Sequence, residues 1–102
     1  MDAIRLVQAL PKSEEARVIG RQLLRSATSV AANYRAAGRA RSKPEFVAKI
    51  GIVVEEADES ILWLELLAEA AIIPRQKTEP LLQEANQILA MFVASRRTAT
   101  QR

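Results

Sequence analysis

The chain has 102 residues, 49 % of them hydrophobic, and a net charge of +3, which suits one compact domain and is too short for two. It has no cysteine and no histidine, which excludes disulfides, thiolate nucleophiles and the commonest general base and transition-metal ligand. No apolar run is long enough to span a bilayer and the N-terminus shows no signal-peptide pattern, so we expect a cytoplasmic protein without a membrane partner.

Two helices are predicted in the first 40 residues. The first spans residues 2–10 and is interrupted by Pro11. The second runs from Glu14 to Gly38, with Ser13 as its N-cap. The positions expected to face the core are Ile4, Val7 and Leu10 in the first helix, and Ile19, Leu23, Ala27, Val30, Tyr34 and Ala37 in the second.

Two more helices are predicted in the remainder of the chain. A capping box at residues 42–45 starts the third, which continues to about residue 71. Thr78 is expected to cap the fourth over residues 79–97, and residues 98–102 are expected to form a frayed polar tail. The inward positions are Phe46, Ile50, Val53, Ala57, Ile61, Leu64 and Ala68 in the third helix, and Leu81, Leu82, Ala85, Ile88, Leu89 and Phe92 in the fourth.

Four helices with short connections predict an all-α fold, an antiparallel up-down four-helix bundle with a short first helix, formed by residues 1–97 as a single domain. At ~1.5 Å per residue the second and third helices span almost 40 Å, whereas the first spans only about 15 Å. Part of the groove between the second and third helices should therefore lack a fourth wall. Either another subunit fills it, or Met1 is a late start and the chain is short at its N-terminus.

The third helix carries apolar residues outside its inner stripe, interleaved with acidic ones. A helix that is apolar on two sides has two partners to bury against, so we predict a homo-oligomer. The residues predicted to form its interface are Ile52, Trp63 and Leu66. The alternative is that Trp63 packs on the first helix as part of the core.

The second helix carries an unbalanced row of arginines. Between Arg17 and Lys43 there are seven basic residues and no acidic one. Arg17, Arg21, Arg25, Arg35 and Arg39 fall within an arc of about 80°, opposite the apolar face, and we call this row the arginine ridge. Fixed guanidinium groups match phosphates or carboxylates. The predicted nucleic-acid-binding residues are Arg17, Arg21, Arg25, Arg35, Arg39, Arg41 and Lys43.

Two interpretations of the arginine ridge stay open. In the first it binds the phosphate backbone of structured RNA or duplex DNA, because scarce aromatics argue against base stacking. In the second it meets an acidic surface on a neighbouring subunit or another protein. The halves of the chain differ in charge, with ten basic against four acidic residues in 1–50 and five against eight in 51–102, which is compatible with both.

No catalytic residue, metal site or cofactor is predicted. The acidic cluster of Glu55, Glu56, Asp58 and Glu59 is the only candidate metal or acid–base site, but di-metal bundles use Glu-x-x-His pairs from several helices. We therefore expect a solvated or arginine-paired face, with Arg25 pairing with Glu56. No base is present to activate the helical serines, and Ser26 and Asn33 are expected to form hydrogen bonds across helices.

Three sequence elements between Leu10 and Leu67 resemble a known family. They are Arg25-Ser26 followed by Thr28-Ser29-Val30 and Asn33, the joint Arg41-Ser42-Lys43-Pro44-Glu45-Phe46, and the run at 56–67 containing Glu-Ala-Asp-Glu-Ser and Trp-Leu-Glu-Leu-Leu. Their order and spacing are similar to those of the four helix bundle protein family, also called the 23S rRNA-intervening-sequence protein family. That family is related to the accessory proteins of diversity-generating retroelements.

The resemblance implies a bundle that assembles into a ring or barrel, typically a homopentamer. It also implies that basic surface binds nucleic acid and that a reverse transcriptase or another protein is a partner. Carried over by position, Arg21, Arg25, Arg35 and Arg39 would form that basic surface, whereas Asn33 and Glu56 would be conformational. The family pattern begins with a longer first helix than this chain has.

These observations together predict a non-enzymatic, homo-oligomeric protein, pentameric by the resemblance, that binds nucleic-acid backbone through the arginine ridge. The alternative is a structural adaptor that binds another protein and uses its arginines for charge pairing between subunits.

Overall fold

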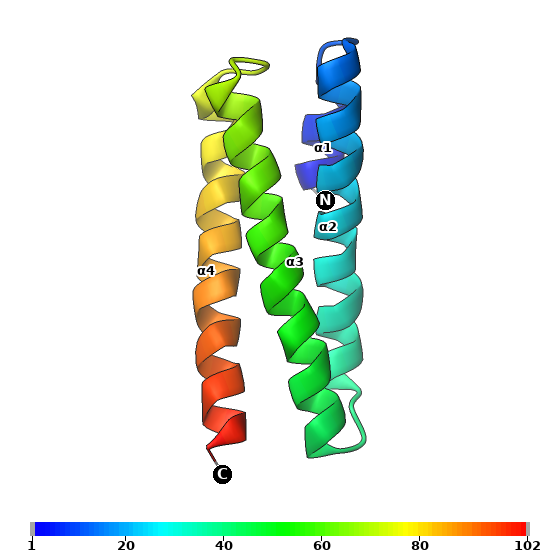
Figure 1. Cartoon of the computed structure of the whole chain (residues 1–102), viewed down its shortest axis with the longest axis vertical. Coiled ribbons are helices and arrows are strands. Elements are labelled where there is room, and N and C mark those ends of the chain that lie inside the picture. The colour runs from blue at the N-terminus through cyan, green and yellow to red at the C-terminus, as the bar shows by residue number, and fades with distance from the viewer. Residues whose placement is uncertain (1, 102) are drawn as a thin grey trace.

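The computed structural model describes residues 2–101 and confirms the predicted all-α, up-down four-helix bundle with a short first helix. The helices are α1 (Asp2–Gln8), α2 (Glu14–Gly38), α3 (Lys43–Glu69) and α4 (Arg75–Thr100). The three long helices run side by side in alternating directions, and α1 covers only one end of the bundle (Figure 1). The molecule is therefore elongated, measuring 47 × 18 × 17 Å.

Side-chain caps start α2 and α3 where the sequence predicts them. The Ser13 hydroxyl accepts a hydrogen bond from the Ala16 N–H at 3.2 Å, and the Ser42 hydroxyl accepts one from the Glu45 N–H at the same distance. In a capping box the side chain at the third helical position accepts a hydrogen bond from the N–H of the N-cap residue. Here the Glu45 carboxylate accepts one from the N–H of the preceding residue, Arg41, at 3.4 Å. Each cap thus satisfies one of the N–H groups that the first turn of a helix leaves without an intrahelical partner.

The end of α3 is defined by a backbone motif that the sequence does not predict. Ala71 has a φ of 55°, the left-handed region that usually favours glycine. Its N–H donates to the Ala68 carbonyl and the Ile72 N–H donates to the Leu67 carbonyl, both at 3.0 Å, which is the hydrogen-bond pattern of a Schellman motif. The helix therefore ends at Glu69, slightly earlier than predicted.

The predicted bounds of the fourth helix were wrong at its start. The helix begins at Arg75, directly after Pro74, which provides no side-chain cap. Thr78 lies inside the first turn, fully buried, and its hydroxyl donates to the Arg75 carbonyl at 3.1 Å. At the other end α4 continues to Thr100, so the predicted polar tail from residue 98 is helical that far. Arg102 lies outside the described residues.

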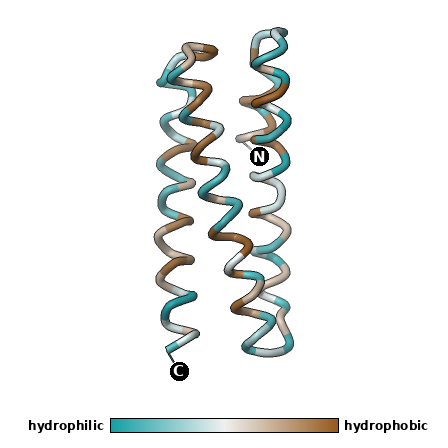
Figure 2. The backbone as a smooth tube through the Cα atoms, viewed as in Figure 1, coloured by the Kyte–Doolittle hydropathy of each residue, from teal (hydrophilic) through white to brown (hydrophobic). Residues whose placement is uncertain are grey.

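The core is built around α3, which packs against both α2 and α4. Hydrophobic positions recur along all three long helices (Figure 2). One buried cluster lies toward the α2–α3 joint and contains Ala37, Ile50, Val53 and Phe92. The other lies toward α1 and contains Leu23, Leu64 and Leu67, with Trp63 packed against it.

Two positions predicted to face the core are exposed. Ile4 is 38 % exposed and its neighbour Ala3 is buried instead, because consecutive residues of a helix point about 100° apart and cannot both face the core. Tyr34 is 55 % exposed, although its ring meets the edge of the Phe92 ring at a centroid distance of 5.3 Å. Tyr34 and Ala3, but not Ile4, line the gap that α1 leaves in the bundle.

Candidate nucleic-acid interface and interhelical groove

The seven predicted nucleic-acid-binding residues are all exposed and follow α2 into the α2–α3 joint. Each arginine of the ridge lies on the side of α2 opposite the buried positions Leu23 and Ala37, as the helical spacing predicts. Among the side chains that the structure describes, no carboxylate forms an ion pair with Arg17, Arg21, Arg35, Arg39 or Arg41. Their guanidinium groups are therefore available to an external anion.

Arg25 differs from the other ridge arginines. Its guanidinium donates to the Glu59 carboxylate at 2.5 Å and lies 3.6 Å from Glu56, so the predicted pairing of Arg25 with Glu56 is confirmed. The hydrogen bond with Glu59, followed by the charges of both carboxylates, raises the pKa of Arg25. Its positive charge is matched within the fold, from α2 to α3.

Two surface hollows flank Arg25 along the ridge. The hollow at the α2–α3 joint has a volume of about 430 Å³ and is lined by Ala32, Arg35, Ala36, Arg39, Arg41 and Glu45. The hollow at the α1–α2 joint has a volume of about 530 Å³, and its basic residues are Lys12, Arg17 and Arg21. Lys12 was not among the predicted residues, because it lies in the turn after Pro11, where helical spacing cannot predict which way a side chain points.

Two buried hydroxyls link α2 to α3. Ser26 Oγ and Ser60 Oγ are 2.9 Å apart, and each is also within hydrogen-bond distance of a carbonyl of its own helix, Leu23 and Glu56 respectively. The expected cross-helix bond of Ser26 is confirmed. The expectation for Asn33 was wrong, because its amide donates to the carbonyl and hydroxyl oxygens of Ser29 in the same helix.

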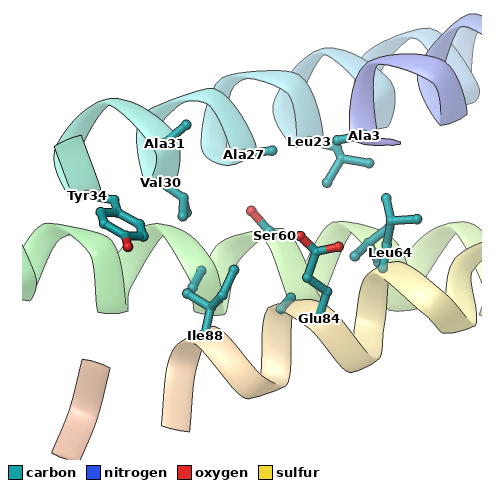
Figure 3. Close-up of a pocket in the computed structure, with 13 residues that line it drawn as sticks. Ala3, Leu23, Ala27, Val30, Ala31, Tyr34, Ser60, Leu64, Glu84 and Ile88 are labelled. Atoms are coloured by element: carbon teal, nitrogen blue, oxygen red, sulfur yellow. The ribbon is translucent and has the colours of Figure 1, made fainter. Parts of the chain in front are cut away.

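A groove of about 440 Å³ lies between α2 and α4 over α3, where α1 does not reach. Ala3 of α1 is at one end and Tyr34 at the other, and the lining is mainly apolar. Glu84 supplies a carboxylate that points into the groove (Figure 3). The predicted incomplete fourth wall is therefore present as a pocket lined by three long helices and the start of α1.

The residues predicted to form an oligomer interface are half-buried in the single chain. Ile52, Trp63 and Leu66 all retain exposed surface, and their neighbour Leu62 is 46 % exposed. Trp63 also packs against the core cluster near α1, and its Nε1 is buried without a hydrogen-bond partner in the described structure. Trp63 therefore has a core contact whether or not another subunit covers it.

The acidic cluster on α3 is divided between solvent and Arg25. Glu55 and Asp58 are exposed, whereas Glu56 and Glu59 face Arg25. Within residues 2–101 no three acidic side chains converge in a way that could hold a metal ion. None of the described helices combines the length and apolarity needed to cross a membrane.

The fold and this surface together define a small helical-bundle protein with an exposed basic face. The family model for the 23S rRNA-intervening sequence protein matches residues 1–94, and the chain belongs to this family. A solved structure of a protein with unknown function from the S23 ribosomal protein family of Bacteroides thetaiotaomicron VPI-5482 is similar, with a TM-score of 0.84 and 32 % identity. That match covers 92 % of this chain and 87 % of the other. No curated protein matches the chain.

Proposed function

We propose that the protein is a non-enzymatic, homo-oligomeric nucleic-acid-binding protein that contacts the phosphate backbone through the arginine ridge and the α2–α3 joint. The observation that carries this proposal is the set of five exposed arginines, Arg17, Arg21, Arg35, Arg39 and Arg41, without a carboxylate partner among the described side chains. Guanidinium groups bind phosphate oxygens bidentately, so such a row suits a polyanion. The family's association with 23S rRNA intervening sequences agrees with a nucleic-acid role.

The proposal of a non-catalytic role rests on the side chains available. The sequence has no histidine and no cysteine, and the buried hydroxyls of Ser26 and Ser60 lie against each other and against backbone carbonyls. A serine without a neighbouring base remains a weak nucleophile. Binding, rather than bond chemistry, is what these residues can support.

Homo-oligomerisation, as a pentamer by family resemblance, would place several arginine ridges on one particle. Linked sites bind a polyanion far more tightly than a single site does, because each later contact becomes intramolecular. The open groove and the half-buried apolar residues of α3 support self-association.

Fluorescence anisotropy against a structured RNA and a DNA duplex, measured over a salt series, tests the binding proposal. We expect affinity to fall linearly in log salt, with a slope of about −0.9 per phosphate on duplex DNA. The triple variant Arg21→Glu, Arg35→Glu and Arg39→Glu should lose binding while its helical circular dichroism is retained. Absence of wild-type binding at low salt would refute the proposal.

Sedimentation velocity tests the oligomer and its interface. Leu62→Glu introduces a charge beside the predicted interface residues, and we expect it to lower the mass toward that of the 11.3 kDa monomer. Val18→Glu on α2 is the matched control, because Val18 is similarly exposed at 53 % and lies on another helix. A monomeric wild-type protein, or an unchanged mass for Leu62→Glu, would argue against this interface.

The second candidate function is that of a structural adaptor for another protein. The groove between α2 and α4 favours it, since an apolar pocket with one carboxylate could receive an apolar segment carrying a basic residue. Arg25 also forms ion pairs with two carboxylates of its own chain, so a ridge arginine can pair with carboxylates of a protein. In the salt series this function is distinguished by the lack of any nucleic-acid binding.

A further inference from the structure

We infer that the arginine ridge is bipartite and that it takes double-stranded nucleic acid at two separate backbone positions, with the centre of the ridge left out of contact. This inference rests on the proposed nucleic-acid function. It adds which class of nucleic acid is bound and which arginines contact its phosphates. The helical spacing in the sequence describes one continuous row, whereas the structure divides that row at Arg25.

The centre of the ridge offers no free charge to a phosphate. Arg25 is held by Glu59 and Glu56 of α3, and the exposed Glu55 adds a negative charge nearby on the same helix. Between Arg25 and Arg35 the ridge face carries Thr28, whose hydroxyl donates to the Leu24 carbonyl at 2.6 Å, and the small Ala32. A phosphate placed there would meet neutral groups and the carboxylates that hold Arg25.

The two ends of the ridge are basic hollows. Arg35, Arg39 and Arg41 line the one at the α2–α3 joint. The one at the α1–α2 joint has a mainly apolar wall, and Lys12, Arg17 and Arg21 supply its charge. Each hollow combines basic side chains from α2 and from the adjoining turn. Arg17 and Arg21 of α2 lie with Lys12 at the first hollow, and Arg35 of α2 lies with Arg39 and Arg41 at the second, so a phosphate would be approached from two directions. Glu45 lines the second hollow, where three arginines outnumber it. Glu14 and Glu15 directly follow Ser13, which lines the first hollow with three basic residues.

The spacing of the two hollows favours a duplex. The midpoint of Arg17 and Arg21 and the midpoint of Arg35 and the C-cap residue Arg39 are 18 residues apart along α2, or about 27 Å. That distance corresponds to about eight base pairs at ~3.4 Å per pair, and a duplex holds its phosphates at fixed positions over such a length. A flexible single strand would lose conformational entropy across the centre of the ridge, where Arg25 is already paired and no phosphate contact compensates for that loss.

Single-stranded nucleic acid lacks the contacts that it usually needs. Proteins that bind single strands stack the bases on aromatic side chains. The chain has four aromatic residues, and none is on the ridge. The most exposed of them, Tyr34, lines the groove on another face of α2.

Salt slopes measured on variants test this inference. The probe is a duplex of about 16 base pairs, as DNA and as RNA, with the single strand of the same sequence as the control; this length is roughly twice the spacing of the hollows. Either end variant, Arg17→Gln with Arg21→Gln or Arg35→Gln with Arg39→Gln, should flatten the slope on duplex DNA by about 2. Arg25→Gln should leave the slope unchanged, and the single strand should bind at least about tenfold more weakly than the duplex.

A second pair of substitutions covers the case in which Arg25→Gln perturbs the fold. Glu56→Gln with Glu59→Gln keeps the shapes of both side chains and releases Arg25, so the slope should steepen by about 1 as a new phosphate contact becomes available. Any of three results would overturn the bipartite site alone. The first is a slope for Arg25→Gln that flattens as much as it does on loss of one arginine from a hollow. The others are an unchanged slope for the double glutamine variant and equal binding of single strand and duplex. Absence of wild-type binding would overturn the proposed function as well.

Discussion

The docking of α1 on α2 depends on a glycine, and replacing it tests how closely the two helices pack. An added Cβ at Gly20 would lie 2.9 Å from Leu10 Cδ1 and 3.2 Å from Val7 Cγ1. Both distances are shorter than ordinary van der Waals contact, and Val7 is stiff because it is β-branched. Gly51 on α3 is the matched control, since its Cβ would meet only Arg96 Nη1, at 3.9 Å.

The expected change in unfolding free energy is the sum of two opposing contributions. Replacing a glycine by alanine inside a helix stabilises it by about 0.8–1.0 kcal/mol through helix propensity. Gly51→Ala should show that gain in full. Gly20→Ala gains the same amount but overpacks against α1, at a cost of about 1–3 kcal/mol. The two variants should therefore differ in unfolding free energy by about 1–3 kcal/mol, with Gly20→Ala at or below the wild type.

Thermal unfolding followed by circular dichroism measures this difference. For a domain of this size 1 kcal/mol shifts the Tm by about 4–8 °C, so Gly51→Ala should melt at least about 4 °C above Gly20→Ala. Hydrogen exchange in residues 2–10 should also increase in Gly20→Ala and remain unchanged in Gly51→Ala, because only the first displaces α1. Equal stabilisation by both substitutions would refute the close packing of α1 on α2.

Three further substitutions probe the turn and the buried hydroxyls. Ala71→Gly should stabilise the protein by about 0.5–1 kcal/mol, because it relieves the positive φ at the end of α3; a loss of stability in urea titrations would contradict the Schellman geometry. Ser26→Ala and Ser60→Ala should each cost about 0.5–1.5 kcal/mol, and the double variant should cost less than their sum, since both remove the same bond between helices. Additive costs would show that the two hydroxyls act separately.

The sequence by itself determined the helical architecture. The caps at Ser13 and Ser42 are local features, because a hydroxyl and the N–H groups three residues later meet as soon as the first turn forms. The apolar period located the buried face of α2, and the arginine spacing located its exposed face, since helical geometry fixes both. The shortness of α1 was also enough to predict an incomplete fourth wall.

Only the tertiary structure decided which local signals apply and which arginines are free. Thr78 looks like a cap in sequence, but it is buried in the first turn of a helix that Pro74 already begins. Ala71 takes a glycine-like conformation because α3 and α4 must turn there, and no local propensity reports this. Arg25 is one of five equivalent arginines in the sequence, yet its partners lie 31 and 34 residues away on α3. Such long-range pairings depend on how the helices pack, and that packing separates the ridge into two basic hollows with a neutralised centre.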